Sequence, residues 1–164
     1  MRFFRRTPAD LREHIRSFDI VVVGGGNTRS MLAVWRDWEF AAVLREAYEA
    51  GTILCGWSAG SICWFEHGVT DSIAGPLTAM PALGFLAGSN CPHYDGEKER
   101  RPAYHRLVAE GAMPAGYGCD DGAALHFAGE RLNAVISARP GAFAYHVERD
   151  GRQAVERRLD ALLL

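Results

Sequence analysis

The stretch DIVVVGGGNT, residues Asp19 to Thr28, decides the fold class. Its run of four β-branched residues, 20–23, predicts a buried strand. A helical region follows from about residue 30, and a second helix over 40–50 ends before Gly51, a residue suited to a helix C-terminus. A second short buried strand is expected over 52–56. This strand–helix–strand unit, Asp19 to Trp57, predicts an α/β fold with a parallel sheet covered by helices.

The remainder of the chain carries weaker signals. Thr7 and Pro8 are expected to begin a short helix before the first strand. Asp150-Gly151 is a hairpin turn signal. Further elements are expected as a helix over 59–66, a loop with short strands over 75–88, a helix over 101–111, and strands over 131–137 and 142–149. The 164 residues fit one domain, 1–164, with room for a sizeable core.

Composition narrows the function class. The formal net charge is −2, which argues against nucleic acid or an anionic membrane as the main partner. The segment Met1–Arg6 lacks the apolar run of a signal peptide, and no apolar stretch approaches the length of a membrane helix. The four cysteines form no CxxC pair, so we expect reduced thiols in a cytoplasmic protein. They are Cys55, Cys63, Cys91 and Cys119.

The segment Gly56-Trp57-Ser58-Ala59-Gly60 has the pattern G-x-S-x-G between a predicted strand and a predicted helix. In that context the small residues allow a sharp turn that exposes the serine hydroxyl, and the helix N-terminus offers free N–H groups to a developing negative charge. A capping serine in a tight turn is the alternative. The pattern alone leaves both interpretations of Ser58 open.

A nucleophilic serine needs a base and an acid that orients the base. Among six histidines, His93 stands out because its loop, Asn90 to Gly96, follows an apolar segment. Asp120 and Asp121, which precede a glycine, are the attractive acids, although paired loop aspartates are often only solvated. A metal site built from Cys91, His93, Cys119 and Asp120 is conceivable, but its spacing is not a usual zinc pattern.

The glycine run Gly24-Gly25-Gly26 does not fit a phosphate-binding loop. Arg29 occupies the last position of a dinucleotide fingerprint, and the lysine of a P-loop is absent. Because neighbouring parallel strands end at one edge of a sheet, the run is better explained as a source of a backbone N–H donor beside Ser58.

Together, VVGGGNT (22–28), GWSAG (56–60) and NCPH (90–93) resemble the peptidase E family of cytosolic serine peptidases, over roughly residues 10 to 150. The resemblance implies a three-layer, mostly parallel sheet with helices on both faces, as in class I glutamine amidotransferases. It implies Ser58 as nucleophile, His93 as base and Asp121 as acid, where the family usually has a glutamate. It also implies the Gly26 and Ala59 amides as oxyanion hole.

The chain departs from the family in two ways. Members usually carry a further strand–helix–strand portion before the first strand, and its loss would expose a sheet edge, so we expect a homodimer or higher oligomer. The family also recognises an N-terminal aspartate with arginine chemistry downstream of the histidine. Arg100 or Arg101 could supply it, with Asn27 as a further candidate substrate ligand; a solvated charged helix start is the alternative.

The sequence therefore predicts a serine peptidase that needs no cofactor or metal and acts on dipeptides or short peptides with an N-terminal aspartate. Two alternatives stay open. One is a cyanophycinase-like hydrolase of β-aspartyl-arginine, and the other is a catalytically silent binding or assembly protein. The order Ser, His, acid differs from the order Ser, acid, His of α/β-hydrolases, so a lipase or esterase is not indicated.

Overall fold

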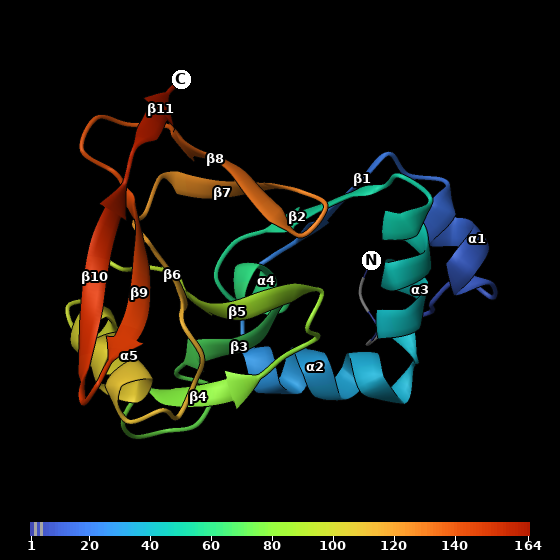
Figure 1. Cartoon of the computed structure of the whole chain (residues 1–164). Coiled ribbons are helices and arrows are strands. Elements are labelled where there is room, and N and C mark those ends of the chain that lie inside the picture. The colour runs from blue at the N-terminus through green and yellow to red at the C-terminus, as the bar shows by residue number, and fades with distance from the viewer. Residues whose placement is uncertain (2, 4) are drawn as a thin grey trace.

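The computed structural model describes residues 1, 3 and 5–164; Arg2 and Phe4, within the segment considered as a possible signal peptide, lie outside the described residues. Helices and strands are mixed over residues 11–109, and the elements from residue 116 to residue 163 are all strands (Figure 1). The helices are α1 (Leu11–Arg16), α2 (Thr28–Asp37), α3 (Phe40–Glu49), α4 (Ala59–Ile62) and α5 (Arg100–Ala109). The strands are β1 (Ile20–Val23), β2 (Ile53–Gly56), β3 (Phe65–Thr70), β4 (Thr78–Pro81), β5 (Leu86–Cys91), β6 (Gly116–Cys119), β7 (Ala123–Ala128), β8 (Arg131–Ser137), β9 (Ala144–Asp150), β10 (Gln153–Leu159) and β11 (Ala161–Leu163).

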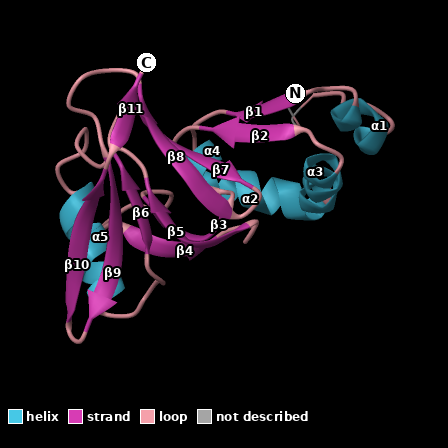
Figure 2. Ribbon diagram, turned by 45° about the horizontal axis from the view of Figure 1, so that its top comes forward, coloured by secondary structure: helices cyan, strands magenta, loops and turns pink. Residues whose placement is uncertain are grey.

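The predicted strand–helix–strand unit is confirmed, but its strands are not buried as predicted, because Ile20, Val22 and Ile53 are more than half exposed. β1 and β2 pair in parallel, with Ile20 opposite Ile53 and Val23 opposite Gly56. α2 and α3 connect them, and Gly51 follows the second helix with a positive φ of 102°. Figure 2 shows this pair of strands standing beside α3, apart from the larger sheet. The first helix begins later than expected, because Asp10 rather than Thr7 is its N-cap and accepts a hydrogen bond from the amide of Glu13.

The expectation of one mostly parallel sheet is not met, because the sheets are mixed. A six-stranded sheet has the order β10-β9-β6-β5-β3-β4, and a three-stranded sheet has the order β11-β8-β7. In the six-stranded sheet β5 pairs in parallel with β3 and β6, whereas β4, β9 and β10 pair antiparallel. For β10 the physical reason is a short connection. The Gly151–Arg152 turn joins β9 to β10 as the predicted hairpin, and such turns join only antiparallel strands.

The helix expected over 59–66 is shorter than predicted. α4 ends at Ile62, and the chain then enters β3 at Phe65. Gly68 allows β3 to pack closely against α4, because a side chain at position 68 would overlap the Ile62 side chain of α4. The helix over 100–109 and the strand over 131–137 match the predicted elements closely.

Two apolar clusters form most of the core. One joins the helices α2 and α3 to β1 and to the segment after α4, with Trp35, Leu44 and Trp64 buried in it. The other lies between α5 and the six-stranded sheet, where Tyr104 packs with Val69 and Val147. The first cluster includes Val23 at the end of β1, and the second includes Cys91 at the end of β5. A smaller third cluster includes Cys119 at the end of β6. No helix in the described part of the chain is long and apolar enough to cross a membrane.

Candidate active site

Ser58 sits in a strained turn between β2 and α4. Its φ of 57° and ψ of −122° lie outside the regions that ordinary residues occupy, and its side chain makes no capping hydrogen bond to the helix. Among the described residues, only Glu39, Ser58 and His93 are non-glycine residues with positive φ. Such strain costs about 1–3 kcal/mol per residue and tends to occur at functional sites. The capping-serine interpretation is therefore not supported for Ser58.

The two glycines of G-x-S-x-G have a clear steric role. A Cβ atom at Gly56 or at Gly60 would overlap the carbonyl oxygen of Val23, the last residue of β1. The turn is thus pressed against the end of the neighbouring strand, and Val23 O also accepts a hydrogen bond from the Trp57 amide at 3.2 Å. This close approach requires glycine at both positions.

The glycine run after β1 lies beside the serine, as the strand-end argument predicts. A Cβ atom built on Gly25 would be 3.2 Å from Ser58 Cβ and 3.5 Å from its Oγ. Gly26 follows in the same loop, and Ala59 begins α4, whose backbone hydrogen bonds start at the next amide, from Gly60 to Trp57 O. Gly26 thus follows the glycine that contacts Ser58, and Ala59 directly follows Ser58 in the chain.

His93 follows β5 and also has a positive φ, 56°. Its Nδ1 lies 2.7 Å from Oδ1 of Asp121, which follows β6. Because β5 and β6 are neighbouring parallel strands, their carboxyl ends bring the two residues together. An imidazole whose Nδ1–H donates to a carboxylate keeps Nε2 free to accept a proton.

The two adjacent aspartates are directed differently. Asp120 is buried, and its Oδ2 accepts a hydrogen bond of 2.9 Å from the amide of Phe143, before β9. Burial and the nearby charge of Asp95 raise the Asp120 pKa, although the hydrogen bond from Phe143 opposes this effect. Asp121 is the one that faces His93, a distinction that the sequence alone left open.

A buried polar link ties the serine turn to the strands that carry His93 and Asp121. Ser61 Oγ of α4 donates to Oδ1 of Asn90 in β5 at 2.7 Å, and Asn90 Nδ2 donates to the carbonyl of Tyr117 in β6 at 3.3 Å. Asn90 is fully buried. The hydrogen bonds of Asn90 therefore hold α4 against β5 and β6. These two strands belong to a different sheet from β2, the strand that precedes α4.

The cysteines near the site do not compete with Ser58 as nucleophiles. Cys63 and Cys91 are fully buried, and burial strongly raises the pKa of both thiols. Burial, with the charges of Asp120 and Asp121, raises the Cys119 pKa to about 12. These three residues are protonated thiols at neutral pH. The described residues contain no group of three His, Cys, Asp or Glu side chains arranged to hold a metal ion.

The candidate substrate ligands all have internal partners. Asn27 caps α2 by accepting from the Ser30 amide at 2.9 Å, and its Nδ2 donates to the carbonyl of Ser72. Arg100 is only 3% exposed and donates to the carbonyl of Val69 and to Glu97. Such contacts assign Asn27 and Arg100 to holding loops in place.

Arg101 is half-exposed, but its guanidinium is paired with Glu156 of β10 and lies over the Tyr145 ring at 4.7 Å. The two arginines at the start of α5 therefore both have partners within the fold, Arg100 on β3 and Arg101 on β10.

Two residues at the site were not expected from the sequence. Asp95 Oδ1 accepts a hydrogen bond of 2.8 Å from the Asp121 amide, and Arg139, between β8 and β9, donates to both Asp95 and the Asp121 carbonyl. Asp95 lies two residues after His93 in the sequence, but its residue type does not indicate a hydrogen bond to the Asp121 amide. Arg139 is a single charged residue in a turn, and only the fold brings it to the site.

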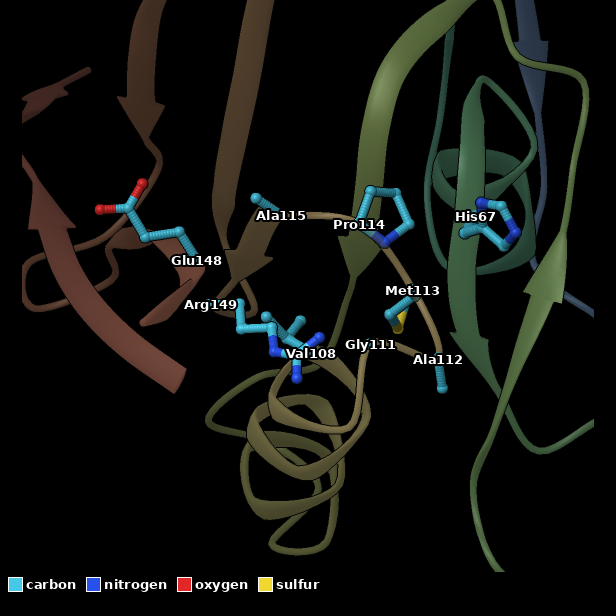
Figure 3. Close-up of a pocket in the computed structure, with 9 residues that line it drawn as sticks. All are labelled: His67, Val108, Gly111, Ala112, Met113, Pro114, Ala115, Glu148 and Arg149. Carbon is cyan, nitrogen blue, oxygen red and sulfur yellow. The ribbon is translucent and has the colours of Figure 1, made fainter. Parts of the chain in front are cut away.

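A separate hollow lies away from these residues. It has a volume of about 660 Å³ and is lined by the loop before β6 together with His67, Glu148 and Arg149. Figure 3 shows Pro114 and Ala115 of this loop between the side chains of β9 and of β3. Ala115 precedes β6 whereas Asp121 follows it, so the hollow is at the opposite end of that strand from the candidate site.

Several known proteins are similar to this chain in sequence. Residues 1–135 match Peptidase family S51. An uncharacterized peptidase, YgaJ, of Bacillus subtilis strain 168 is 52% identical over 147 residues, which cover 90% of this chain and 64% of the relative. Peptidase E of Shewanella amazonensis is 33% identical over 136 residues, covering 76% of this chain and 57% of the relative. The chain thus spans about three fifths of the length of these relatives, and it belongs to Peptidase family S51.

Proposed function

We propose that this chain is a serine peptidase that hydrolyses dipeptides or short peptides beginning with aspartate. The observation that carries the proposal is the pairing of His93 with Asp121 at 2.7 Å. These two residues follow β5 and β6, and the Ser61–Asn90 hydrogen bond connects β5 to α4, the helix that begins after the strained turn of Ser58. The family and the names of the relatives support a peptidase. The three-layer, amidotransferase-like arrangement belongs to the same proposal and is supported by the parallel pairs β1–β2 and β3–β5–β6.

In the proposed reaction Ser58 Oγ attacks the scissile carbonyl while His93 Nε2 takes its proton. Asp121 accepts the Nδ1–H bond, fixes the tautomer and stabilises the imidazolium. The amides of Gly26 and Ala59 would hold the oxyanion, and His93 then returns the proton to the leaving amine. Water repeats the cycle on the acyl-enzyme and frees the acid. Loss of one oxyanion donor typically costs about 100- to 1000-fold in rate.

Preference for an N-terminal aspartate rests on the family resemblance. Asn27, Arg100 and Arg101 were the candidate ligands for the substrate, and each has partners within the fold. If one of them contacts the substrate carboxylate, it must exchange a partner on binding. Arg101 is the candidate best placed for this, because its side chain is 48% exposed and that of Arg100 is 3% exposed.

The test is release of aspartate from Asp-Leu by the wild-type protein and by Ser58→Ala. Ala-Leu serves as the comparison substrate, and Ser17→Ala, an exposed serine at the end of α1, as the matched variant. We expect turnover of Asp-Leu to be abolished in Ser58→Ala and unchanged in Ser17→Ala, with both folded by circular dichroism. Turnover retained by folded Ser58→Ala would end the assignment.

The two alternative functions make different predictions. A cyanophycinase-like enzyme would release aspartate faster from β-aspartyl-arginine than from Asp-Leu, so the two substrates are compared in the same assay. A silent binding protein would cleave neither. The shared turn does not favour one of the hydrolases, and the names of the relatives favour peptidase E.

We also propose that copies of the chain associate through the β1–β2 sheet. One face of this sheet exposes apolar side chains that lie next to one another in register: Ile20 and Val22 of β1 and Ile53 of β2 are more than half exposed. Trp57, 60% exposed, extends the surface toward Ser58. Exposed apolar patches and open strand edges favour association.

A further inference from the structure

A closed ring of hydrogen bonds surrounds the backbone of Asp121. Asp95 Oδ1 accepts from the Asp121 amide at 2.8 Å, and Arg139 Nε donates to the Asp121 carbonyl at 2.9 Å. The ring closes because Arg139 Nη2 donates to Asp95 Oδ2 at 2.6 Å. One ion pair therefore holds both backbone polar groups of Asp121, and the Asp121 side chain is left to face His93.

Neighbouring residues fix the two members of this ion pair. The hydroxyl of Ser137, at the end of β8, donates to the Arg139 carbonyl at 2.6 Å. The space beside the second carboxylate oxygen of Asp121 is limited, since a Cβ atom at Gly96 would overlap Asp121 Oδ2. The arginine therefore approaches from the β8–β9 turn, and the loop after His93 confines the carboxylate from the other side.

We infer that Asp95 and Arg139 are positioning residues, which act through Asp121 to hold the imidazole of His93 in its Nδ1–H tautomer. This inference rests on the proposed function, because it gives Asp121 the part of the acid. The reason such a device is needed is exposure: the Asp121 side chain is 52% exposed and that of His93 27%. One hydrogen bond to its side chain fixes an exposed loop carboxylate poorly, so the carboxylate needs a fixed backbone to stay aligned.

The charges of Asp95 and Arg139 also favour this arrangement. Burial acts to raise the Asp95 pKa, but the hydrogen bonds from the Asp121 amide and from Arg139 outweigh it and hold this pKa below its usual range. Asp95 is therefore ionised at neutral pH, and Arg139 balances its charge. Without Arg139, two carboxylates would lie close together beside His93, which would favour rotation of one of them away.

The kinetic test compares Arg139→Gln with Arg106→Gln. Arg106 is a matched control because its side chain is also 47% exposed and also donates to one carboxylate, Glu110, and one carbonyl, that of Leu77. We expect kcat for Asp-Leu to fall about 100-fold in Arg139→Gln, the loss that follows from a displacement of about 1 Å at a catalytic group. KM stays nearly unchanged, since the acid does not bind the substrate.

Conservative variants sharpen the result. Arg139→Lys can pair with Asp95 but cannot reach two acceptors in the fork geometry of arginine, so it should lie between the wild type and Arg139→Gln. Asp95→Asn keeps an oxygen for the Asp121 amide and should lose less activity than Asp95→Ala. Equal losses in Asp95→Asn and Asp95→Ala would contradict positioning through this hydrogen bond.

A second readout does not depend on turnover. In protein labelled with ¹⁵N-histidine, the nitrogen shifts report which ring nitrogen of His93 carries the proton at neutral pH, with His93→Gln to assign the signals. We expect Nδ1–H in the wild type and in Arg106→Gln, and a shift toward Nε2–H in Arg139→Gln. An unchanged tautomer in Arg139→Gln overturns the inference. If no peptide is cleaved but the tautomer shifts, the proposed function fails and the positioning role stands.

Discussion

The two halves of the candidate site are held in opposite ways. The serine half depends on the lack of side chains at two glycines: Gly56 and Gly60 let the turn pack against the carbonyl of Val23. The histidine half depends on polar atoms that are present. Asp95 and Arg139 hold Asp121, and Glu156 accepts a hydrogen bond of 2.6 Å from Tyr94, the residue after His93. We therefore expect added side-chain atoms to destabilise the serine half and the removal of polar groups to destabilise the histidine half.

The largest effect on stability is expected from Gly60→Ala. The added methyl group would overlap the Val23 carbonyl, which is backbone and cannot rotate away. Overpacking of this kind costs about 1–3 kcal/mol and occasionally more, and we expect the upper end or beyond. Urea unfolding measures the loss. The matched control is Gly24→Ala, where the nearest atom would be Trp57 Cζ2 at 3.6 Å, an ordinary contact. Equal stability of the two variants would contradict the steric account.

A smaller loss, about 2 kcal/mol, is expected from Glu156→Gln at neutral pH. The Glu156 side chain, 13% exposed, accepts hydrogen bonds from Tyr94 and His105 and pairs with Arg101. Hydrogen bonds to charged groups contribute about 1.5–3 kcal/mol. The loss should appear as a lower urea midpoint with an unchanged slope.

The Glu156 effect should also depend on pH. Burial alone would raise the Glu156 pKa, but the hydrogen bonds from Tyr94, Arg101 and His105 outweigh it and lower this pKa below the usual value of 4.5. A lowered pKa in the folded state gives stability that is full above the unfolded value and is lost as pH falls through the folded value. The stability gap between the wild type and Glu156→Gln should therefore narrow below about pH 4.5. A gap that widened there would reverse the assigned sign.

The smallest effect compares two strands. Val69 of β3 is fully buried and Val22 of β1 is 57% exposed. Valine and threonine have nearly the same shape, so Val69→Thr mainly buries a hydroxyl, at a cost of about 1–3 kcal/mol. Val22→Thr should change stability by less than about 0.5 kcal/mol.

If the β1–β2 face joins copies of the chain, Val22→Thr should instead shift sedimentation toward monomer. A wild-type monomer at micromolar concentration would contradict the proposed association.

The sequence predicted the parts of the fold that rest on local patterns. The run of β-branched residues before Gly24 and the helix end at Gly51 identify the β1–β2 unit, because strand propensity and a left-handed helix end leave direct marks in residue type. The same run also predicted full burial, which is wrong for Ile20 and Val22. The antiparallel partner of β6 could not be predicted in the same way. Pairing between distant strands such as β6 and β9 depends on tertiary packing and leaves no periodic signal.

The residues of the candidate site differ in the same way: those in local motifs could be predicted, and those that only the fold brings together could not. Ser58 and His93 stand in short motifs, and the preference for Asp121 came from the family resemblance. Arg139 could not be found, because its role depends on a turn after β8 that reaches Asp121 from 18 residues away in the sequence. The same holds for the packing of Arg100, which the sequence offered as a candidate ligand for a substrate carboxylate, with a solvated helix start as the alternative. The burial of Arg100 follows from α5 packing on β3, where it meets the carbonyl of Val69.

The central claim is that the strain at Ser58 belongs to an activated nucleophile. The most direct measurement is covalent labelling with a fluorophosphonate, which reacts with activated serines, followed by peptide mapping. We predict stoichiometric labelling of Ser58 in the wild type, none in Ser58→Ala and little in His93→Ala. Folded wild-type protein that takes up no label, or that takes it up at Ser61 in place of Ser58, would contradict the account.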